Sequence, residues 1–109
     1  MKKLKELIGN IKVIKTVGNI DTAVVGITDN SRLVKPNFLF FAIKGVSLDG
    51  HRYINNAIEK GCKVIICTHL PNKINQDVCY VVVENIRESV YEISSKYYND
   101  PAKKIKIIA

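Results

Sequence analysis

The distribution of apolar residues predicts strands that alternate with helices along the chain. Six stretches have the composition of β-strands: 12–17, 22–28, 38–43, 63–68, 78–83 and 104–109. The run 38–43 (FLFFAI) is the most apolar of them and contains aromatic residues. We therefore expect it to be a central strand that is buried on both faces.

Three stretches have the spacing of amphipathic helices: 2–8, 51–60 and the segment from Asn85 to the Asn99-Asp100-Pro101 turn. Asn85 followed by Glu88 fits a capping box at the start of the third helix. That helix also carries a stripe of tyrosines (Tyr91, Tyr97 and Tyr98), for which packing is the favoured role over base stacking.

The segment 38–68 reads as strand, loop, helix and strand, which is a βαβ unit with a right-handed crossover. Together with the other predicted strands, it indicates the α/β class. We expect a single three-layer domain, with a mixed and mostly buried sheet of about five strands and flanking helices.

Composition narrows the class of protein further. The chain has 109 residues, of which 47% are hydrophobic and 25% charged, as in ordinary globular domains. It contains no apolar run of the roughly 20 residues that span a bilayer, and its first residues do not resemble a signal peptide. We expect a cytoplasmic protein. Cys62, Cys67 and Cys79 form no CxxC pair, which favours buried reduced thiols over a zinc or disulfide site.

The formal net charge of +7 raises the possibility of nucleic-acid binding. However, the lysines are dispersed and do not gather with aromatic residues in a stacking motif. Codon bias in an AT-rich genome explains the lysine excess more simply. A preference for anionic ligands and a basic nucleic-acid-binding module remain alternatives.

A polar stretch at 28–32 (TDNSR) interrupts the pattern between two strands. Asp, Asn and Ser side chains can bond to nearby backbone amides, so local chemistry alone favours a plain turn over a ligand-binding corner. A second loop, 44–50, begins near Gly45, which permits close backbone approach. The helix expected near His51 would offer amides to an anion, unless Asp49 occupies them as an N-cap.

Short motifs in this order resemble the N-terminal domain of the Mur ligases over essentially the whole chain. They are Ser31-Arg32, Leu39-Phe40, Ala42, Gly45, Asp49-Gly50-His51, the segment 57–61 (AIEKG) and the KVIIC strand. The KLKEL start, the GVSLDGHRYI spacing and the tyrosine-rich helix are most similar to the MurE type. The MurF type, which adds D-alanyl-D-alanine, is the alternative.

The resemblance implies an ATP-dependent ligase of peptidoglycan synthesis. Such an enzyme joins a diamino acid (meso-diaminopimelate or L-lysine) to UDP-N-acetylmuramoyl-L-alanyl-D-glutamate through an acyl phosphate. Catalytic, ATP-binding and magnesium-binding residues belong to the central and C-terminal domains of the family. Residues 1–109 would therefore be a fragment that ends just before the ATP-binding domain. Its implied role is to hold the UDP end of the precursor.

The resemblance also places the binding residues. Ser31 should contact the UDP moiety, and Asp29 and Asn30 should shape its turn. Val46, Ser47 and Leu48 should line the uracil or ribose pocket. Asn30 stands where the family has aspartate, and Asn37-Phe38 stand where it has Gly-Asp. A purely structural domain without ligand affinity in isolation is a further alternative.

Overall fold

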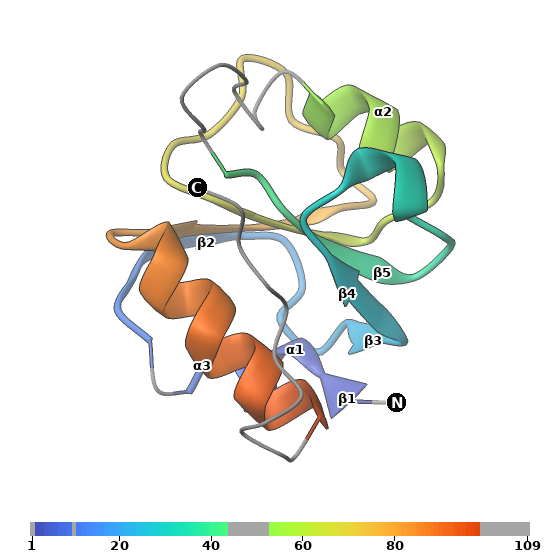
Figure 1. The fold of residues 1–109 in the computed structure, drawn as a ribbon. Coiled ribbons are helices and arrows are strands. Elements are labelled where there is room, and N and C mark those ends of the chain that lie inside the picture. Colours follow the sequence, from blue (N-terminus) through green and yellow to red (C-terminus); the bar gives the residue numbers. More distant parts are fainter. Residues whose placement is uncertain (1, 10, 44–52, 99–109) are drawn as a thin grey trace.

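The computed structural model describes residues 2–9, 11–43 and 53–98 (Figure 1). These residues form a five-stranded sheet with the order β2-β7-β6-β5-β4. Its strands are β2 (Val13–Val17), β4 (Gly26–Thr28), β5 (Phe38–Phe41), β6 (Val64–Cys67) and β7 (Cys79–Val83). β2 runs antiparallel to β7, and the other neighbours are parallel. The predicted mixed sheet is confirmed, while the strand expected at 104–109 lies outside the described residues.

Helices cover both faces of this sheet, which gives the three layers that the sequence predicted. α1 (Leu4–Leu7) and α3 (Ile86–Tyr98) lie on one face, and α2 (Ile54–Glu59) lies on the other (Figure 1). The short 3-10 helix η1 (Ser31–Leu33) contacts α2.

The strand β5 is buried on both faces, as predicted. Leu39 and Phe41 pack on the side of α3, whereas Phe40 and Ala42 pack on the side of α2. Burial of each large side chain contributes about 1.5–3 kcal/mol. The middle position of the sheet is nevertheless held by β6, because β4 is an edge strand beyond β5.

The prediction of one strand over 22–28 is wrong. The structure divides the stretch at Val25. β3 (Ala23–Val24) pairs with β1 (Lys2–Lys3) in a separate two-stranded sheet, whereas β4 joins the main sheet. At Val25 the backbone N–H donates to the carbonyl of Asn37, and the carbonyl accepts from the hydroxyl of Tyr97. The chain therefore changes sheets at this residue.

The three predicted helices are present, and the first begins later than expected. α1 starts at Leu4 because Lys2 and Lys3 pair with β3, and the N–H of Leu4 donates to the carbonyl of Thr22 at 2.9 Å. α2 is described from Ile54, and the helix start expected near His51 lies outside the described residues. Residues 44–52, and the predicted end of α3 at 99–101, lie outside the described residues.

The start of α3 confirms the Asn85 half of the predicted capping box, because the Asn85 side-chain oxygen accepts from the N–H of Glu88 at 3.0 Å. The prediction of a packed tyrosine stripe is correct only for Tyr97, which packs against the core. Tyr91 and Tyr98 are 49% and 41% exposed. The helix buries Val90, Ile93 and Ser94 instead, so these two tyrosines, seven positions apart, share its outer face.

The edge strand β2 contains an irregularity. Its pairing with β7 runs from Val13 opposite Val83 to Lys15 opposite Val82, so the register shifts at Ile14. Ile14 has no opposite residue there and is 64% exposed. This is the signature of a β-bulge.

Candidate functional site

The parallel strands β4, β5, β6 and β7 direct their carboxyl ends to one edge of the sheet. Ligands of open α/β sheets bind outside this edge. The predicted turn at 28–32 follows β4 directly, so the structure places it on this edge. The loop that follows β5, with Val46, Ser47 and Leu48, lies outside the described residues. The second half of the predicted pocket therefore stays a prediction.

The corner, which we define as residues 28–33, is closed by its own hydrogen bonds. The Thr28 hydroxyl oxygen accepts from the N–H of Asn30 at 3.1 Å. The Asn30 side-chain oxygen accepts from the N–H of Arg32 at 3.0 Å, which caps η1. Asn and Asp cap helices about equally well. Asn30 therefore caps η1 as an aspartate at this position would.

Two polar side chains of the corner are available for a ligand. Ser31 is partly exposed, and its hydroxyl has no hydrogen-bond partner within residues 2–9, 11–43 and 53–98. Asp29 is half-buried. Burial raises the pKa of its carboxyl above the usual 3.8, and a backbone hydrogen bond partly offsets this. The predicted trio of Asp29, Asn30 and Ser31 thus combines a hydroxyl, an amide and a poorly hydrated carboxyl on one exposed turn.

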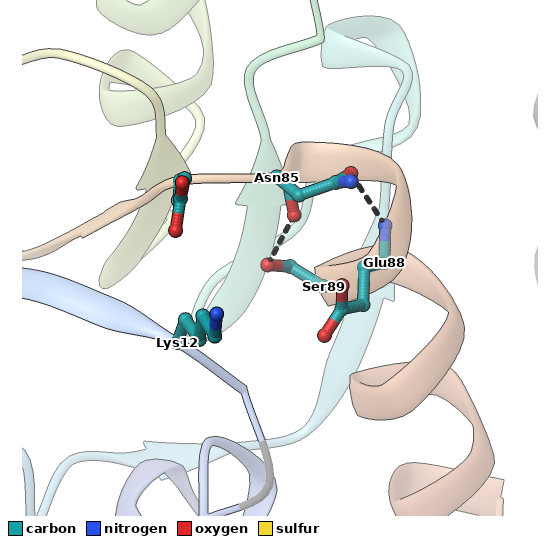
Figure 2. A pocket seen from close by; sticks show the side chains of 5 residues that line it. Lys12, Asn85, Glu88 and Ser89 are labelled. Atoms are coloured by element: carbon teal, nitrogen blue, oxygen red, sulfur yellow. Dashed lines mark hydrogen bonds between the residues drawn. The ribbon is translucent and has the colours of Figure 1, made fainter.

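A pocket that the sequence did not predict lies on the same edge, beside the start of α3 (Figure 2). It has a volume of about 400 Å³ and is lined by Lys12, Glu84, Asn85, Glu88 and Ser89. Lys12 reaches this edge because β2 is antiparallel to β7, which places the amino end of β2 beside Val83. From the sequence, Asn85 and Glu88 were expected only to cap the third helix, and nothing distinguished Lys12 from the other dispersed lysines.

The pocket and the corner are separate places. β7 and β4 are three strand spacings apart, which is about 14 Å. In the pocket, the Ser89 hydroxyl donates to the carbonyl of Asn85 at 2.8 Å. One lysine and two glutamates give the pocket a net negative charge, and none of the three is ion-paired among the described residues. A diphosphate would meet repulsion there, so the pocket does not fit the anionic part of a nucleotide.

The cysteines offer neither a nucleophile nor a metal site. Cys62, Cys67 and Cys79 are buried and unpaired, which confirms the predicted buried thiols. Burial raises the pKa of Cys62 to about 12 and that of Cys67 to about 11. Thiols with such values remain protonated and unreactive at neutral pH. Over the described part of the chain, no three His, Cys, Asp or Glu side chains gather as metal ligands.

One protein family matches a segment that contains the corner and the four pocket residues that follow β7. The model described as "Mur ligase family, catalytic domain" matches residues 23–106. None of the helices in the described residues is long and apolar enough to cross a membrane.

Two curated relatives illustrate the similarity in sequence. The UDP-N-acetylmuramoyl-L-alanyl-D-glutamate--2,6-diaminopimelate ligase of Phocaeicola vulgatus is 35% identical over 97% of this chain. The UDP-N-acetylmuramyl-tripeptide synthetase of Borrelia garinii subsp. bavariensis is 38% identical over 98% of it. The chain spans only 22% of the length of either relative.

Among solved structures, a crystal structure of MurF from Acinetobacter baumannii superposes with a TM-score of 0.70 over 89% of this chain and 21% of its own length. The two sequences are 19% identical, so this likeness concerns the fold alone.

Proposed function

This chain belongs to the Mur ligase family, and we propose that it is the N-terminal domain of a MurE-type ligase that binds the UDP end of the precursor. The predicted resemblance to the family is thereby confirmed. The full-length enzyme would join a diamino acid to UDP-N-acetylmuramoyl-L-alanyl-D-glutamate in peptidoglycan synthesis. The observation that carries the proposal is the family match over residues 23–106, since it includes the carboxyl ends of all four parallel strands.

The choice of the MurE type rests on the relatives. Those at 35% and 38% identity bear names of diaminopimelate ligases and tripeptide synthetases. The MurF likeness is one of fold, and MurF-type addition of D-alanyl-D-alanine is the alternative. We expect residues of the enzyme outside this chain to select the amino acid that is added.

The chemistry of the corner supports binding of the uracil and ribose part of the precursor. The Ser31 hydroxyl is free to form a hydrogen bond to a ligand. The Asp29 carboxyl is partly removed from water, so hydrogen bonds donated by a ligand would stabilise its charged form. We extend the site to Val46, Ser47 and Leu48, on the strength of the family motif. The bound UDP end would hold the distant peptide carboxylate at the catalytic centre, so that this domain contributes positioning rather than chemistry.

ATP and magnesium are expected outside this chain. No GxxxxGK[ST] stretch occurs in its sequence, although Gly45 and Gly50 have the spacing of the two glycines. His51 and Arg52 follow them in place of the phosphate-binding Lys and Ser or Thr. We therefore assign neither group to these residues. We further propose that the enzyme is cytoplasmic. In the full-length protein, residues 1–109 would work together with the central and C-terminal domains of the same chain.

The test is a calorimetric titration of the full-length protein with UDP-N-acetylmuramoyl-L-alanyl-D-glutamate. We expect Ser31→Ala to weaken binding about tenfold, since one hydrogen bond of roughly 1–1.5 kcal/mol is lost. Thr16→Ala, on the edge strand β2 and exposed, is the matched control and should bind as the wild type does. Binding that Ser31→Ala leaves unchanged would contradict the assigned site.

Two further measurements separate the alternatives. Assays with meso-diaminopimelate, L-lysine and D-alanyl-D-alanine as acceptors distinguish the MurE from the MurF type. Titration with a random oligonucleotide at increasing salt tests the basic module. If affinity for the oligonucleotide fell steeply with salt while the UDP precursor did not bind, the ligase proposal would be wrong.

A further inference from the structure

The junction between β3 and β4 is fixed from two sides at Val25. Its N–H donates to the carbonyl of Asn37 at 3.0 Å, which continues the attachment of β4 to β5. Its carbonyl accepts from the hydroxyl of Tyr97 at 2.8 Å, across a sequence separation of 72 residues. The last turn of α3 therefore holds the backbone at the point where the chain enters the main sheet.

Tyr97 is itself held in place. Its ring packs against the core cluster that contains Val90 and Ile93, and it meets the ring of Tyr98 edge-on at 5.0 Å. The neighbouring Lys96 ammonium donates to the carbonyl of Glu6 at 3.3 Å, which ties the same turn to α1. Burial and the neighbouring Tyr98 raise the pKa of Tyr97.

The strand between this junction and the corner is short. β4 has three residues, Gly26–Thr28, and within the described residues it pairs on one side only, with β5. Val25 and Thr28 are about 10 Å apart along it. Thr28 then bonds to Asn30 and starts the corner. All three residues of β4 are buried and paired with β5, so the strand links Val25 to the corner as one packed segment.

We propose that Tyr97 is a positioning residue for the corner: its hydroxyl anchors β4 and thereby places Ser31 for the UDP end of the precursor. The inference rests on the proposed function of the corner. It gives the end of α3, which is distant in the sequence from the predicted binding residues, a part in substrate affinity. Tyr97 acts through the backbone of Val25 and not by contact with the ligand.

The test compares Tyr97→Phe with Tyr98→Phe in the full-length enzyme. Both variants keep the edge-on ring pair, but only the first loses the bond to Val25. We expect Tyr97→Phe to raise the KM and the dissociation constant for the UDP precursor about three- to tenfold, with kcat and the KM for ATP unchanged. Tyr98→Phe should match the wild type in all four.

An unchanged KM and dissociation constant for the precursor in Tyr97→Phe, or equal increases in both variants, would contradict the inference. A merely structural role would lower the active fraction, which reduces kcat without raising the KM for the precursor. Circular dichroism and thermal melting establish that both variants are folded at the assay temperature.

Ser31→Ala separates this inference from the proposed function. If the wild type binds the precursor and Ser31→Ala weakens it, while Tyr97→Phe does not, only the positioning role is wrong. If the wild type does not bind the precursor at all, the proposed function fails and the positioning role fails with it.

Discussion

The corner and the pocket lie on the same edge of the sheet but are held by different kinds of contact. In the corner, hydrogen bonds join residues two or three positions apart, such as Thr28 with Asn30 and Asn30 with Arg32. The pocket brings together Lys12 and Glu88, which only the pairing of β2 with β7 places side by side. The corner offers a hydroxyl, an amide and the half-buried carboxyl of Asp29, whereas the pocket offers three charges without ion pairs among the described residues.

Because they are held differently, the corner and the pocket should respond differently to substitutions. The corner carries its own shape but depends on β4 for its location. The pocket depends on tertiary packing for its existence. Perturbations of the core should therefore affect both, whereas changes in β4 or in the caps should affect one and leave the other.

The largest expected effect comes from the buried thiol of Cys62, which should destabilise the whole fold, and with it both regions, at alkaline pH. Burial raises the pKa of Cys62 from 9.0 to about 12, so the folded state disfavours the thiolate. Stability is complete below pH 9 and falls as pH rises toward 12, by about 1.4 kcal/mol per pH unit for this thiol. Urea midpoints between pH 8 and 11 measure the loss.

Cys62→Ala isolates the thiol from the lysines and tyrosines that also titrate in this range. The variant should be less stable at pH 8 but lose stability less steeply above pH 9. Equal slopes for the variant and the wild type would show that Cys62 does not cause the decline.

The next largest effect should separate the corner from the pocket. A Cβ at Gly26 would lie 2.3 Å from the Phe38 ring, so Gly26→Val must displace the ring or β4. We expect a loss of about 1–3 kcal/mol in the free energy of unfolding, and weaker binding of the UDP precursor. Denaturant unfolding and calorimetry of the full-length protein measure the two.

Gly18→Ala is the matched control for this variant. Gly18 has a φ of 109°, and its Cβ would lie 2.9 Å from the Cα of Cys79, at the opposite edge of the sheet. It should destabilise the fold while leaving precursor affinity as in the wild type. Equal loss of affinity in both variants would mean that β4 has no special part in the site.

A smaller effect should be confined to the pocket side. Asn85→Ala removes the cap of α3, with an expected cost of about 1 kcal/mol in the free energy of unfolding. Asn85→Asp keeps an acceptor for the N–H of Glu88 and should recover most of this stability. Precursor affinity should stay unchanged in both variants, and a loss in either would link the pocket to the binding of UDP.

The smallest effect concerns Asp29 in the corner. Its pKa is raised by burial, so the charged form is disfavoured in the folded state, and this cost is present above the folded pKa and absent below 3.8. Asp29→Asn should therefore raise the thermal midpoint slightly at pH 7 and leave it unchanged at pH 3. A lower midpoint at pH 7 would contradict the raised pKa.

Features that depend on neighbouring residues were the ones that the sequence predicted well. The turn at Asn30 and the cap at Asn85 each need a polar side chain and a backbone amide two or three residues on. The buried strand at 38–41 follows from its continuous apolar run.

Features that depend on distant residues could not be predicted in this way. The division of 22–28 at Val25 depends on hydrogen bonds to Asn37 and Tyr97. The residues next to Val25 in the sequence do not indicate either of these partners. The pocket requires the antiparallel direction of β2, which periodicity does not encode. Tyr91 and Tyr98 were assigned to packing because aromatic residues are usually core residues, although the helix buries a different face.

The bulge in β2 bears on the behaviour of the protein at high concentration. A regular edge strand can pair with the same strand of another molecule and begin aggregation. Here the register shifts at Ile14, and the charged side chains of Lys12 and Lys15 flank the irregular position. The opposite edge, β4, is only three residues long. Within the described residues, both edge strands are thus poor templates for a further strand, and the charges of Lys12 and Lys15 oppose such pairing at β2.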